Sequence, residues 1–379
     1  MRPPAFELER YFARHEFAVP YLLGSSDVEA LSLAELLELA DEGGRRLWED
    51  LSLGYTKPPG APFLREAIAG LYEDVESDDV LVFAGGEEAI FALANVALGP
   101  RDHAVVVWPA YQSLYEVARA TGADVTLLAL GRESDWTLDL DALEQALQPQ
   151  TRAIFVNFPH NPTGSQLDRA SFERLVAIAE GAGALLFSDE VYRWLEHDPS
   201  LRPPAAVDAS PAAVSLGVMS KTFALAGLRI GWVACRDRRL LARLAAFKDY
   251  TTICSSAPSE VLSFIALGAV DRIVERSRAI VDANLPLLDD FFERRAELFD
   301  WVRPHAGPIG FPRLLSEEPI ARFCEELARD ADVLLVPGSI YGHGGNHFRV
   351  GFGRRNLPEA IQRLDRFIDG RPRAGSRAA

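Results

Sequence analysis

One lysine in this sequence lies among residues that favour a reactive amine over a solvated ammonium group. Lys221 lies in the run SLGVMSKTFALAGLRIGW, residues 215–232, among apolar residues and glycines. A charged ammonium is rarely buried without a partner, and burial lowers the pKa of a lysine toward neutrality. A lysine that sheds its proton can attack a carbonyl and form a Schiff base. The alternative is a strand-end lysine whose stem packs while its ammonium reaches water.

A carboxylate at the end of a buried strand is the second candidate. Asp189 follows the apolar run ALLFS, and Tyr192 comes three residues later. Against the nitrogen of a pyridine ring, such a carboxylate would keep the ring protonated and electron-withdrawing, and Tyr192 would reach the same edge. Asp189 would also serve as an ordinary helix cap.

Two arginines suit anionic ligands. Arg229 lies eight residues after Lys221 in an otherwise apolar stretch, where an unpaired guanidinium would be costly and a phosphate is a natural partner. Gly85 and Gly86 precede a predicted helix and offer backbone N–H groups to the same phosphate. Arg349 alternates with apolar neighbours in HFRVGFG, so its side chain faces away from theirs. Such an arginine would bind a substrate carboxylate or, alternatively, lie on the solvent-exposed face of the strand.

Two further features are ambiguous when taken alone. The string NFPHNPTG, residues 157–164, contains two prolines that exclude a helix, and turn chemistry by itself would explain it. Tyr111, in WPAYQSLY, is suited either to stacking on a planar ring or to packing in the core. Their meaning depends on where the fold places them.

The elements that carry these residues alternate between strands and helices. Apolar runs over 153–158, 184–189 and 213–218 predict buried strands, and helical spacing between the first two predicts a βαβ unit in a parallel sheet. Ligands of such sheets gather beyond the carboxyl ends of the strands. That rule collects along one rim Gly85, Gly86, residues 109–111, His160, Asn161, Asp189 and Lys221.

The sequence pattern becomes more helical and more charged after about residue 271. We therefore expect a large domain over residues 45–270 and a smaller α+β domain built from residues 1–44 and 271–370. The small, basic residues 371–379 are expected to form a disordered tail.

Composition narrows the class of protein. Acidic residues outnumber basic ones by 55 to 39, and the net charge is −16, which argues against a nucleic-acid or anionic-membrane binder. No apolar run approaches a membrane span, and the N-terminus has no apolar signal core. The three cysteines show no metal-binding spacing and favour a reducing, cytoplasmic location.

Four segments in order, NFPHNPTG, SDEVY, SKTFALAGLRIGW and FRVGFG, resemble the class I/II aminotransferases of the fold-type-I pyridoxal-phosphate enzymes. The resemblance covers roughly residues 22–370. It implies an α/β fold with a mostly parallel, seven-stranded-type sheet flanked by helices, and a smaller α+β domain. It also implies pyridoxal 5'-phosphate as cofactor, and transfer of an α-amino group from an amino acid to a 2-oxo acid through a Schiff base on Lys221.

The same resemblance implies roles for the site residues. Lys221 joins the cofactor and shuttles the proton, and Asp189 pairs with the ring nitrogen. The other implied cofactor contacts are Asn161 and Tyr192 on the ring hydroxyl, Tyr111 stacked on the ring, and Arg229, Ser220 and the backbone of Gly86 and Glu87 on the phosphate. The implied substrate contacts are Arg349 on the α-carboxylate, Asn161 and Ser25.

Tyr55, in LGYTKPPGAPFLREAI, matches a family tyrosine that reaches a phosphate in the partner subunit, so the resemblance implies a homodimer with shared active sites. Val218 departs from the family pattern, which has Ser or Thr there, and this removes one phosphate contact. No second arginine is evident for a side-chain carboxylate. Because Asp27 and Glu29 lie in the segment that usually borders the substrate, we expect neutral or basic amino acids to react better than aspartate or glutamate. The alternative is that both acidic side chains face water.

Two other functions stay open. The segments LLGSSDVEAL and NFPHNPTG also look similar to capreomycidine synthase, a pyridoxal-phosphate lyase-cyclase that acts on an arginine derivative, and the same cofactor residues would serve elimination or cyclisation. A non-catalytic α/β protein that binds a nucleotide on the same rim is the remaining alternative.

Overall fold

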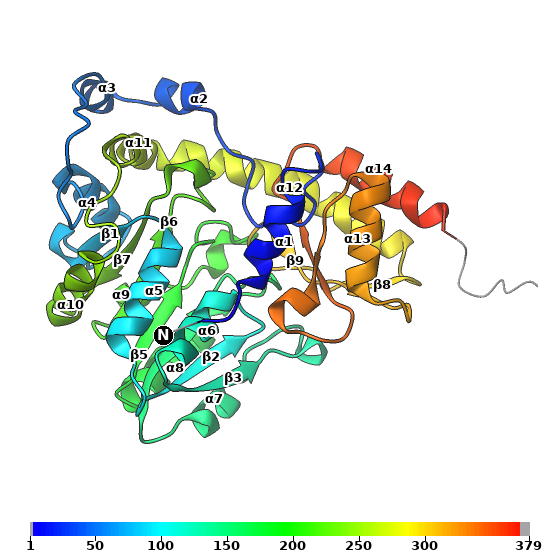
Figure 1. The fold of residues 1–379 in the computed structure, drawn as a ribbon, viewed down its shortest axis with the longest axis horizontal. Coiled ribbons are helices and arrows are strands. Elements are labelled where there is room, and N and C mark those ends of the chain that lie inside the picture. The colour runs from blue at the N-terminus through cyan, green and yellow to red at the C-terminus, as the bar shows by residue number, and fades with distance from the viewer. Residues whose placement is uncertain (1–2, 372–379) are drawn as a thin grey trace, which may run out of the picture.

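Seven strands form the main sheet within residues 3–371, the part of the chain that the computed structural model describes (Figure 1). Their order is β1-β7-β6-β5-β4-β2-β3. The bounds are β1 Val80–Phe83, β2 His103–Trp108, β3 Asp124–Ala129, β4 Thr151–Asn157, β5 Leu185–Asp189, β6 Ala213–Val218 and β7 Gly231–Cys235. Strands β2 to β6 run parallel, whereas β7 is antiparallel to both β1 and β6.

Both faces of this sheet are buried, which is why its strands read as continuous apolar runs. Along β2, Ala104 and Val106 pack on one face while Val105 and Val107 pack on the other, following the two-residue repeat of a strand. The helices packed on the first face are α5 Gly86–Ala97, α6 Gln112–Ala120 and α10 Arg238–Lys248. Those on the second face are α7 Leu140–Ala146, α8 Arg169–Gly181 and α9 Ala206–Ala209.

The predicted strand–helix–strand unit is confirmed. β4, α8 and β5 follow one another, and β4 pairs with β5 in parallel. α8 starts one residue after Asp168, whose side chain accepts a hydrogen bond from the backbone N–H of Ser171 at 2.7 Å, as an N-cap does. The antiparallel β7 was not expected from the periodicity.

A group of helices covers the β1–β7 edge of the sheet. They are α2 Leu33–Glu38, α3 Glu42–Glu49, α4 Pro62–Ala69 and α11 Ala257–Gly268. Leu36 of α2 belongs to the same buried cluster as Leu262 and Ile265 of α11. The domain boundary stays a proposal, and these contacts favour a position before α2 rather than at residue 44.

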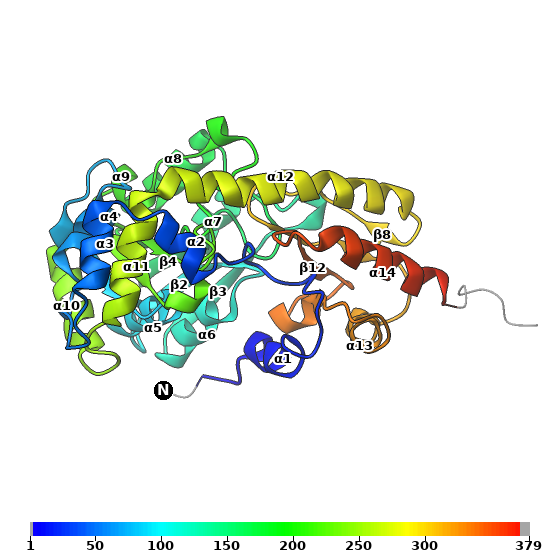
Figure 2. The same cartoon turned by 90° about the horizontal axis from the view of Figure 1, so that it is seen from above.

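The small domain lies at the far end of the long helix α12, Val270–Arg294, which runs from the large domain to the small one along the upper side of Figure 2. Its core joins α12 to the helices α13 Ile320–Ala331 and α14 Leu357–Asp369. Its strands are short: β8 Phe299–Asp300, β9 Ile309–Gly310, β10 Arg313–Leu314, β11 Val336–Pro337 and β12 Phe348–Gly351. Residues 372–379, including nearly all of the expected tail, lie outside the described residues.

The first helix, α1 Glu7–His15, connects the two parts of the molecule (Figure 1). The backbone N–H of Glu7 donates to Oε1 of Gln112 in α6 at 2.8 Å, and Nε2 of Gln112 donates to the carbonyl of Ala5 at 2.8 Å. The hydroxyl of Tyr11 donates to the carbonyl of Leu335 in the small domain at 2.7 Å. Within residues 3–371, no helix combines the length and apolar character needed to cross a membrane.

Candidate active site

A cleft of about 510 Å³ lies at the carboxyl ends of the central strands, between the sheet, α1 and the segment that follows α1. Its lining residues are Phe6, Leu8, Glu9, Phe12, Glu16, Ser25, Ser26, Asp27, Gly86, Glu87, Ile90, Tyr111, Asn157, Asn161, Asp189, Val191, Tyr192, Leu216, Val218, Ser220, Lys221, Ala226 and Arg229. Every predicted site residue is among them except Arg349 and Tyr55.

Adjacent strand ends bring the polar groups together. Asn157 and Asp189 end β4 and β5 and are direct partners in the parallel ladder. Nδ2 of Asn157 donates to the carbonyl of Asp189 at 2.8 Å, and Oδ1 of Asn157 accepts the backbone N–H of Asn161 at 2.9 Å. The turn that carries Asn161 is thereby fixed against the strand end. His160, also expected on this rim, is instead buried behind it, with its Nδ1 2.8 Å from Oγ1 of Thr163.

Lys221 follows β6 and faces the cleft, where its Nζ donates to Oγ of Ser26 at 2.9 Å. The chain has three lysines, and Lys221 is the one that lines this cleft within the described residues. Lys57 is exposed, and the ammonium of Lys248 is buried against two backbone carbonyls at 3.0 and 2.8 Å. Burial lowers the pKa of Lys221, although neighbouring carboxylates oppose the effect. Its amine is therefore poised to lose a proton.

Asp189 is a buried carboxyl group whose charge interacts with that of Lys221. Burial raises its pKa to about 7, while a hydrogen bond from the backbone N–H of Val191 and the charge of Lys221 lower it. A cationic group placed against this carboxylate would lower its pKa and hold it ionised. The site is therefore suited to a ligand that carries a positive charge at this point.

One corner of the cleft lies where α5 begins. Gly85 has a φ of +94°, and a Cβ at this position would lie 2.6 Å from Nη2 of Arg229. Gly86, Ser220 and Arg229 all line the cleft, and a backbone N–H at a helix N-terminus, a hydroxyl and a guanidinium are groups that bind phosphate. Arg229 is exposed at the cleft rather than packed in an apolar core, so the expectation that burial would force it to find a partner is wrong.

Two side chains in this corner have no phosphate-binding role that we can derive. Val218 is buried, and its Cγ1 would lie 2.8 Å from a Cβ on Gly86, so it closes the floor of the cleft. Glu87 lines the cleft, and its Oε2 is buried without a hydrogen-bond partner among the described residues. Burial raises the pKa of Glu87, which favours the neutral acid and reduces its repulsion of an anion.

Arg349 is fully buried, behind the segment that contains Ser25. Its Nε and Nη2 donate to the carbonyl of Gly24 at 2.9 and 2.7 Å, and its Nη1 donates to Oδ1 of Asn161 at 3.2 Å. The structure thus connects Arg349 to the cleft through Asn161. Its role as the α-carboxylate ligand stays a prediction.

Tyr55 lies outside the cleft. Its side chain is 94% exposed, on a surface shared with Leu53 and Cys254. One copy of the chain therefore does not bring Tyr55 to the other site residues. Its assignment to a partner subunit's site stays a prediction.

Residues 23–364 match the family model "Aminotransferase class I and II". The chain belongs to this family. Its place there agrees with a cleft that holds Lys221, Asp189 and Arg229 together, since an amine, a carboxylate and a phosphate-binding group are what an aminotransferase cofactor needs.

Individual relatives include aminotransferases and cyclases. The chain is 29% identical to capreomycidine synthase from Streptomyces vinaceus, with 98% of this chain and 96% of that protein covered. It is 26% identical to an arginine–pyruvate transaminase from Pseudomonas aeruginosa, with 82% and 81% covered. Two solved structures are a PLP-dependent aminotransferase from Streptococcus suis (31% identity, TM-score 0.91, 97% and 98% covered) and the PLP-dependent cyclase OrfR (30%, TM-score 0.90, 98% and 99%).

This aminotransferase-family protein is a pyridoxal-phosphate-dependent enzyme, and its cleft fits that cofactor. The corner at Gly86 and Arg229 matches the phosphate, and Asp189 matches the ring nitrogen. Tyr192 has a buried hydroxyl without a partner among the described residues, which matches the ring hydroxyl. When bound, the cofactor ring withdraws electrons from Cα of an attached amino acid.

One side of the aminotransferase cleft is formed by α1 and the residues next to it, which the sequence analysis did not predict. Glu9 and Phe12 in α1 and its C-cap residue Glu16 are spaced by three and four residues, so they lie on one side of the helix, and all three line the cleft with Phe6. That spacing is visible in the sequence and was the available signal. Glu29, expected to border the substrate, pairs instead with Arg355 at 2.6 Å and does not line the cleft.

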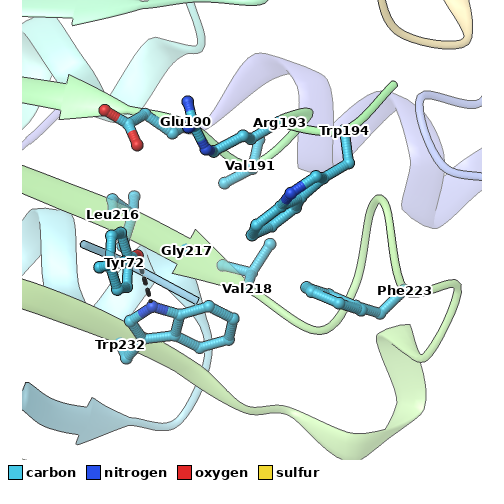
Figure 3. A pocket seen from close by; sticks show the side chains of 10 residues that line it. All are labelled: Tyr72, Glu190, Val191, Arg193, Trp194, Leu216, Gly217, Val218, Phe223 and Trp232. Carbon is cyan, nitrogen blue, oxygen red and sulfur yellow. Dashed lines mark hydrogen bonds between the residues drawn. The ribbon is translucent and has the colours of Figure 1, made fainter. Parts of the chain in front are cut away.

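Figure 3 shows the side chains that line a second, much smaller cavity. Its volume is about 10 Å³, which is room for one water molecule. Glu190 and Arg193 line it, and both have a buried polar atom without a partner among the described residues. Val191, Leu216 and Val218 line both cavities and separate them. The small cavity therefore lies next to the cleft, and its volume is too small to hold an amino-acid substrate.

Proposed function

We propose that this protein is an amino-acid aminotransferase, which moves the α-amino group of an amino acid to a 2-oxo acid. The observation that carries the proposal is the position of Lys221, which lines the cleft and interacts with the buried Asp189. Lys221 holds the cofactor and then carries the proton that leaves Cα. Asp189 keeps the ring nitrogen protonated, and Arg349 with Asn161 binds the α-carboxylate.

The two half-reactions test this proposal. Purified enzyme mixed with an amino acid alone should release one equivalent of 2-oxo acid per site and then stop, with a lasting change in the absorption of its cofactor. Added pyruvate should restore the original spectrum and yield alanine. Sustained turnover of a single amino acid without any 2-oxo acid would contradict transamination.

A lyase or cyclase is the second candidate. Capreomycidine synthase and the cyclase OrfR both match 98% of this chain, including the N-terminal region that forms α1. The residues proposed to hold the cofactor serve both reactions equally. The single-substrate outcome of the half-reaction experiment would favour this second candidate.

We propose further that the amino-acid substrate carries a positive side chain. Glu9 and Glu16 project from α1 into the cleft lining, and no ion pair occupies either of them within residues 3–371. Burial and the charges of Asp27 and Glu9 raise the pKa of Glu16, while Arg354 and Lys221 lower it. A cationic substrate side chain beside these carboxylates would reduce their mutual repulsion and favour their ionised forms. Asp27 is paired with Arg354 at 2.9 Å. One relative is an arginine–pyruvate transaminase, and the arginine in its name is an amino acid with a positive side chain, which supports this proposal.

Replacing Glu16 with glutamine should lower kcat/KM for arginine by roughly ten- to a hundredfold, because the charge-assisted hydrogen bond to the substrate is lost. The kcat/KM for alanine should change little. The matched control is Glu7→Gln, since Glu7 is an exposed residue of the same helix that does not line the cleft. A wild-type preference for aspartate over arginine, measured with the same assay, would refute the proposal that Glu9 and Glu16 bind a cationic side chain.

We also propose a homodimer in which Tyr55 completes the neighbouring phosphate site. The support is the exposure of Leu53, Tyr55, Tyr250 and Ile253, since large exposed apolar groups often mark a subunit interface. Sedimentation of the purified enzyme as a monomer at assay concentration would contradict shared sites. The cytoplasmic location, favoured by the three unpaired cysteines, stays a prediction.

A further inference from the structure

One tyrosine contacts the proposed carboxylate-binding residues from behind. Tyr341 ends the short 3₁₀ helix η5, Gly338–Tyr341, and its side chain is 1% exposed. Its carbonyl accepts a hydrogen bond from Nε1 of Trp108, at the end of β2, at 3.1 Å. Its ring packs edge-on against Phe311, with 6.0 Å between the ring centroids. The position of its hydroxyl is therefore fixed from both the large sheet and the small domain.

The hydroxyl of Tyr341 completes a triangle of polar groups. It accepts a hydrogen bond from Nη1 of Arg349 at 2.5 Å and donates to Oδ1 of Asn161 at 3.3 Å. Nη1 of Arg349 also donates to the same Oδ1 at 3.2 Å. Burial raises the pKa of Tyr341 to about 12, although Arg349 lowers it. The hydroxyl therefore keeps its proton, and its hydrogen-bond donor, at neutral pH.

This triangle determines how Asn161 presents its amide. Oδ1 receives two donors, so the carbonyl end of the amide points toward Arg349 and Tyr341. The NH₂ end must then point away from them, and Asn161 lines the cleft. An amide that accepts on one side and donates on the other offers the cleft a donor and no acceptor.

The triangle also limits the movement of Arg349. Gly24 holds the Nε–Nη2 edge of the guanidinium, and Tyr341 with Asn161 holds Nη1. A fully buried guanidinium needs such acceptors, because each unsatisfied N–H is costly. Because both edges are held, the guanidinium plane of Arg349 cannot rotate without breaking a hydrogen bond to Tyr341 or to Gly24.

We propose that Tyr341 is a positioning residue, which orients Arg349 and Asn161 so that the enzyme distinguishes amino acids from amines that lack the α-carboxylate. The proposal rests on the function proposed above for those two residues. Glu9 and Glu16, which we propose to bind the substrate side chain, are not members of this triangle.

The test compares binding of an acid and its amine. Tyr341→Phe removes the hydroxyl and keeps the ring. Equilibrium binding to the cofactor-loaded protein, followed by absorption, should weaken about three- to tenfold for arginine and phenylalanine, as expected for one lost hydrogen bond. Binding of their decarboxylated amines, agmatine and phenethylamine, should stay within twofold. Tyr72→Phe is the control, since the buried Tyr72 hydroxyl accepts from Nε1 of Trp232 and lies outside the cleft lining.

A double-variant cycle separates positioning from a general loss of structure. In an Arg349→Lys background, Tyr341→Phe should have little further effect, because its action passes through the guanidinium fork. Equal weakening of acids and amines, no weakening of the acids, or full additivity in the cycle would each overturn the proposal. If neither acids nor amines alter the absorption of the wild type, the proposed amino-acid function fails first, so the two failures are distinguishable.

Discussion

Replacing Lys221 with alanine is expected to reduce turnover to the background rate and to leave no cofactor attached after borohydride reduction. The covalent link to the cofactor and the proton carrier are lost together. The fold should persist, because the one hydrogen bond that the ammonium makes in the structure is to Oγ of Ser26. The measurement is mass mapping of the reduced protein together with its circular dichroism spectrum.

The small number of lysines makes this result easy to read. The only lysines of the chain are Lys57, Lys221 and Lys248, so the cofactor fixed by borohydride reduction can be attached to one of three residues. In the wild type it should be found on Lys221 alone. Lys248→Met is the control, because Lys248 holds backbone carbonyls outside the cleft; that variant should lose stability and still carry the label. A label on Lys57 or Lys248 would contradict the assignment of Lys221.

Asp189→Asn should lower kcat by roughly a hundred- to a thousandfold, the effect of removing one preorganised charge that stabilises a transition state, about 3–4 kcal/mol. The neutral amide no longer favours a protonated ring nitrogen, so the ring withdraws electrons less strongly. The cofactor should stay bound, since its phosphate is held by other residues. Single-turnover absorption measurements of Cα–H cleavage would report the effect directly.

Glu190 offers a matched control for Asp189. The two carboxyl groups are adjacent in sequence and both buried, but Asp189 lines the cleft, whereas Glu190 lines the small cavity behind it. Oε1 of Glu190 accepts from the backbone N–H of Ala206 at 2.8 Å, which glutamine can preserve. Glu190→Gln is therefore expected to change kcat less than threefold or so by the rule for unperturbed hydrogen bonds. A loss at Asp189 below tenfold would show that this residue is only a structural cap.

The cofactor half of the site was predictable because strand ends are predictable. A short apolar run followed at once by a polar residue places Asp189 and Lys221 at the same edge of a parallel sheet. The glycines before α5 add a phosphate corner by the same local reasoning. In each case a few neighbouring residues carry the whole signal, and the family resemblance then assigned the roles.

The substrate half was harder because its contacts are remote in sequence. Tyr341 meets Asn161 across 180 positions, and nothing in the apolar string VLLVPGSIYG marks its hydroxyl as a partner. The two-residue repeat of β12 correctly predicted that the Arg349 side chain faces away from those of its neighbours. The repeat does not show whether that face is exposed to solvent or, as here, covered by the Gly24 segment. Glu9 and Glu16 needed the docking position of α1, which an amphipathic pattern alone does not determine.

The attachment of α1 has an evolutionary consequence. Phe6, Glu9, Phe12 and Glu16 line the cleft from outside the central sheet, and α1 is held by Gln112 and by the carbonyl of Leu335. Phe6 packs against Tyr111, and the guanidinium of Arg349 lies over the ring of Phe12, but mutations at Glu9 and Glu16 leave the buried strands untouched. Such a segment can drift, or be exchanged between related enzymes by recombination, at little cost in folding stability. Changes of substrate preference in this lineage are therefore expected to concentrate at the cleft-facing positions Glu9 and Glu16.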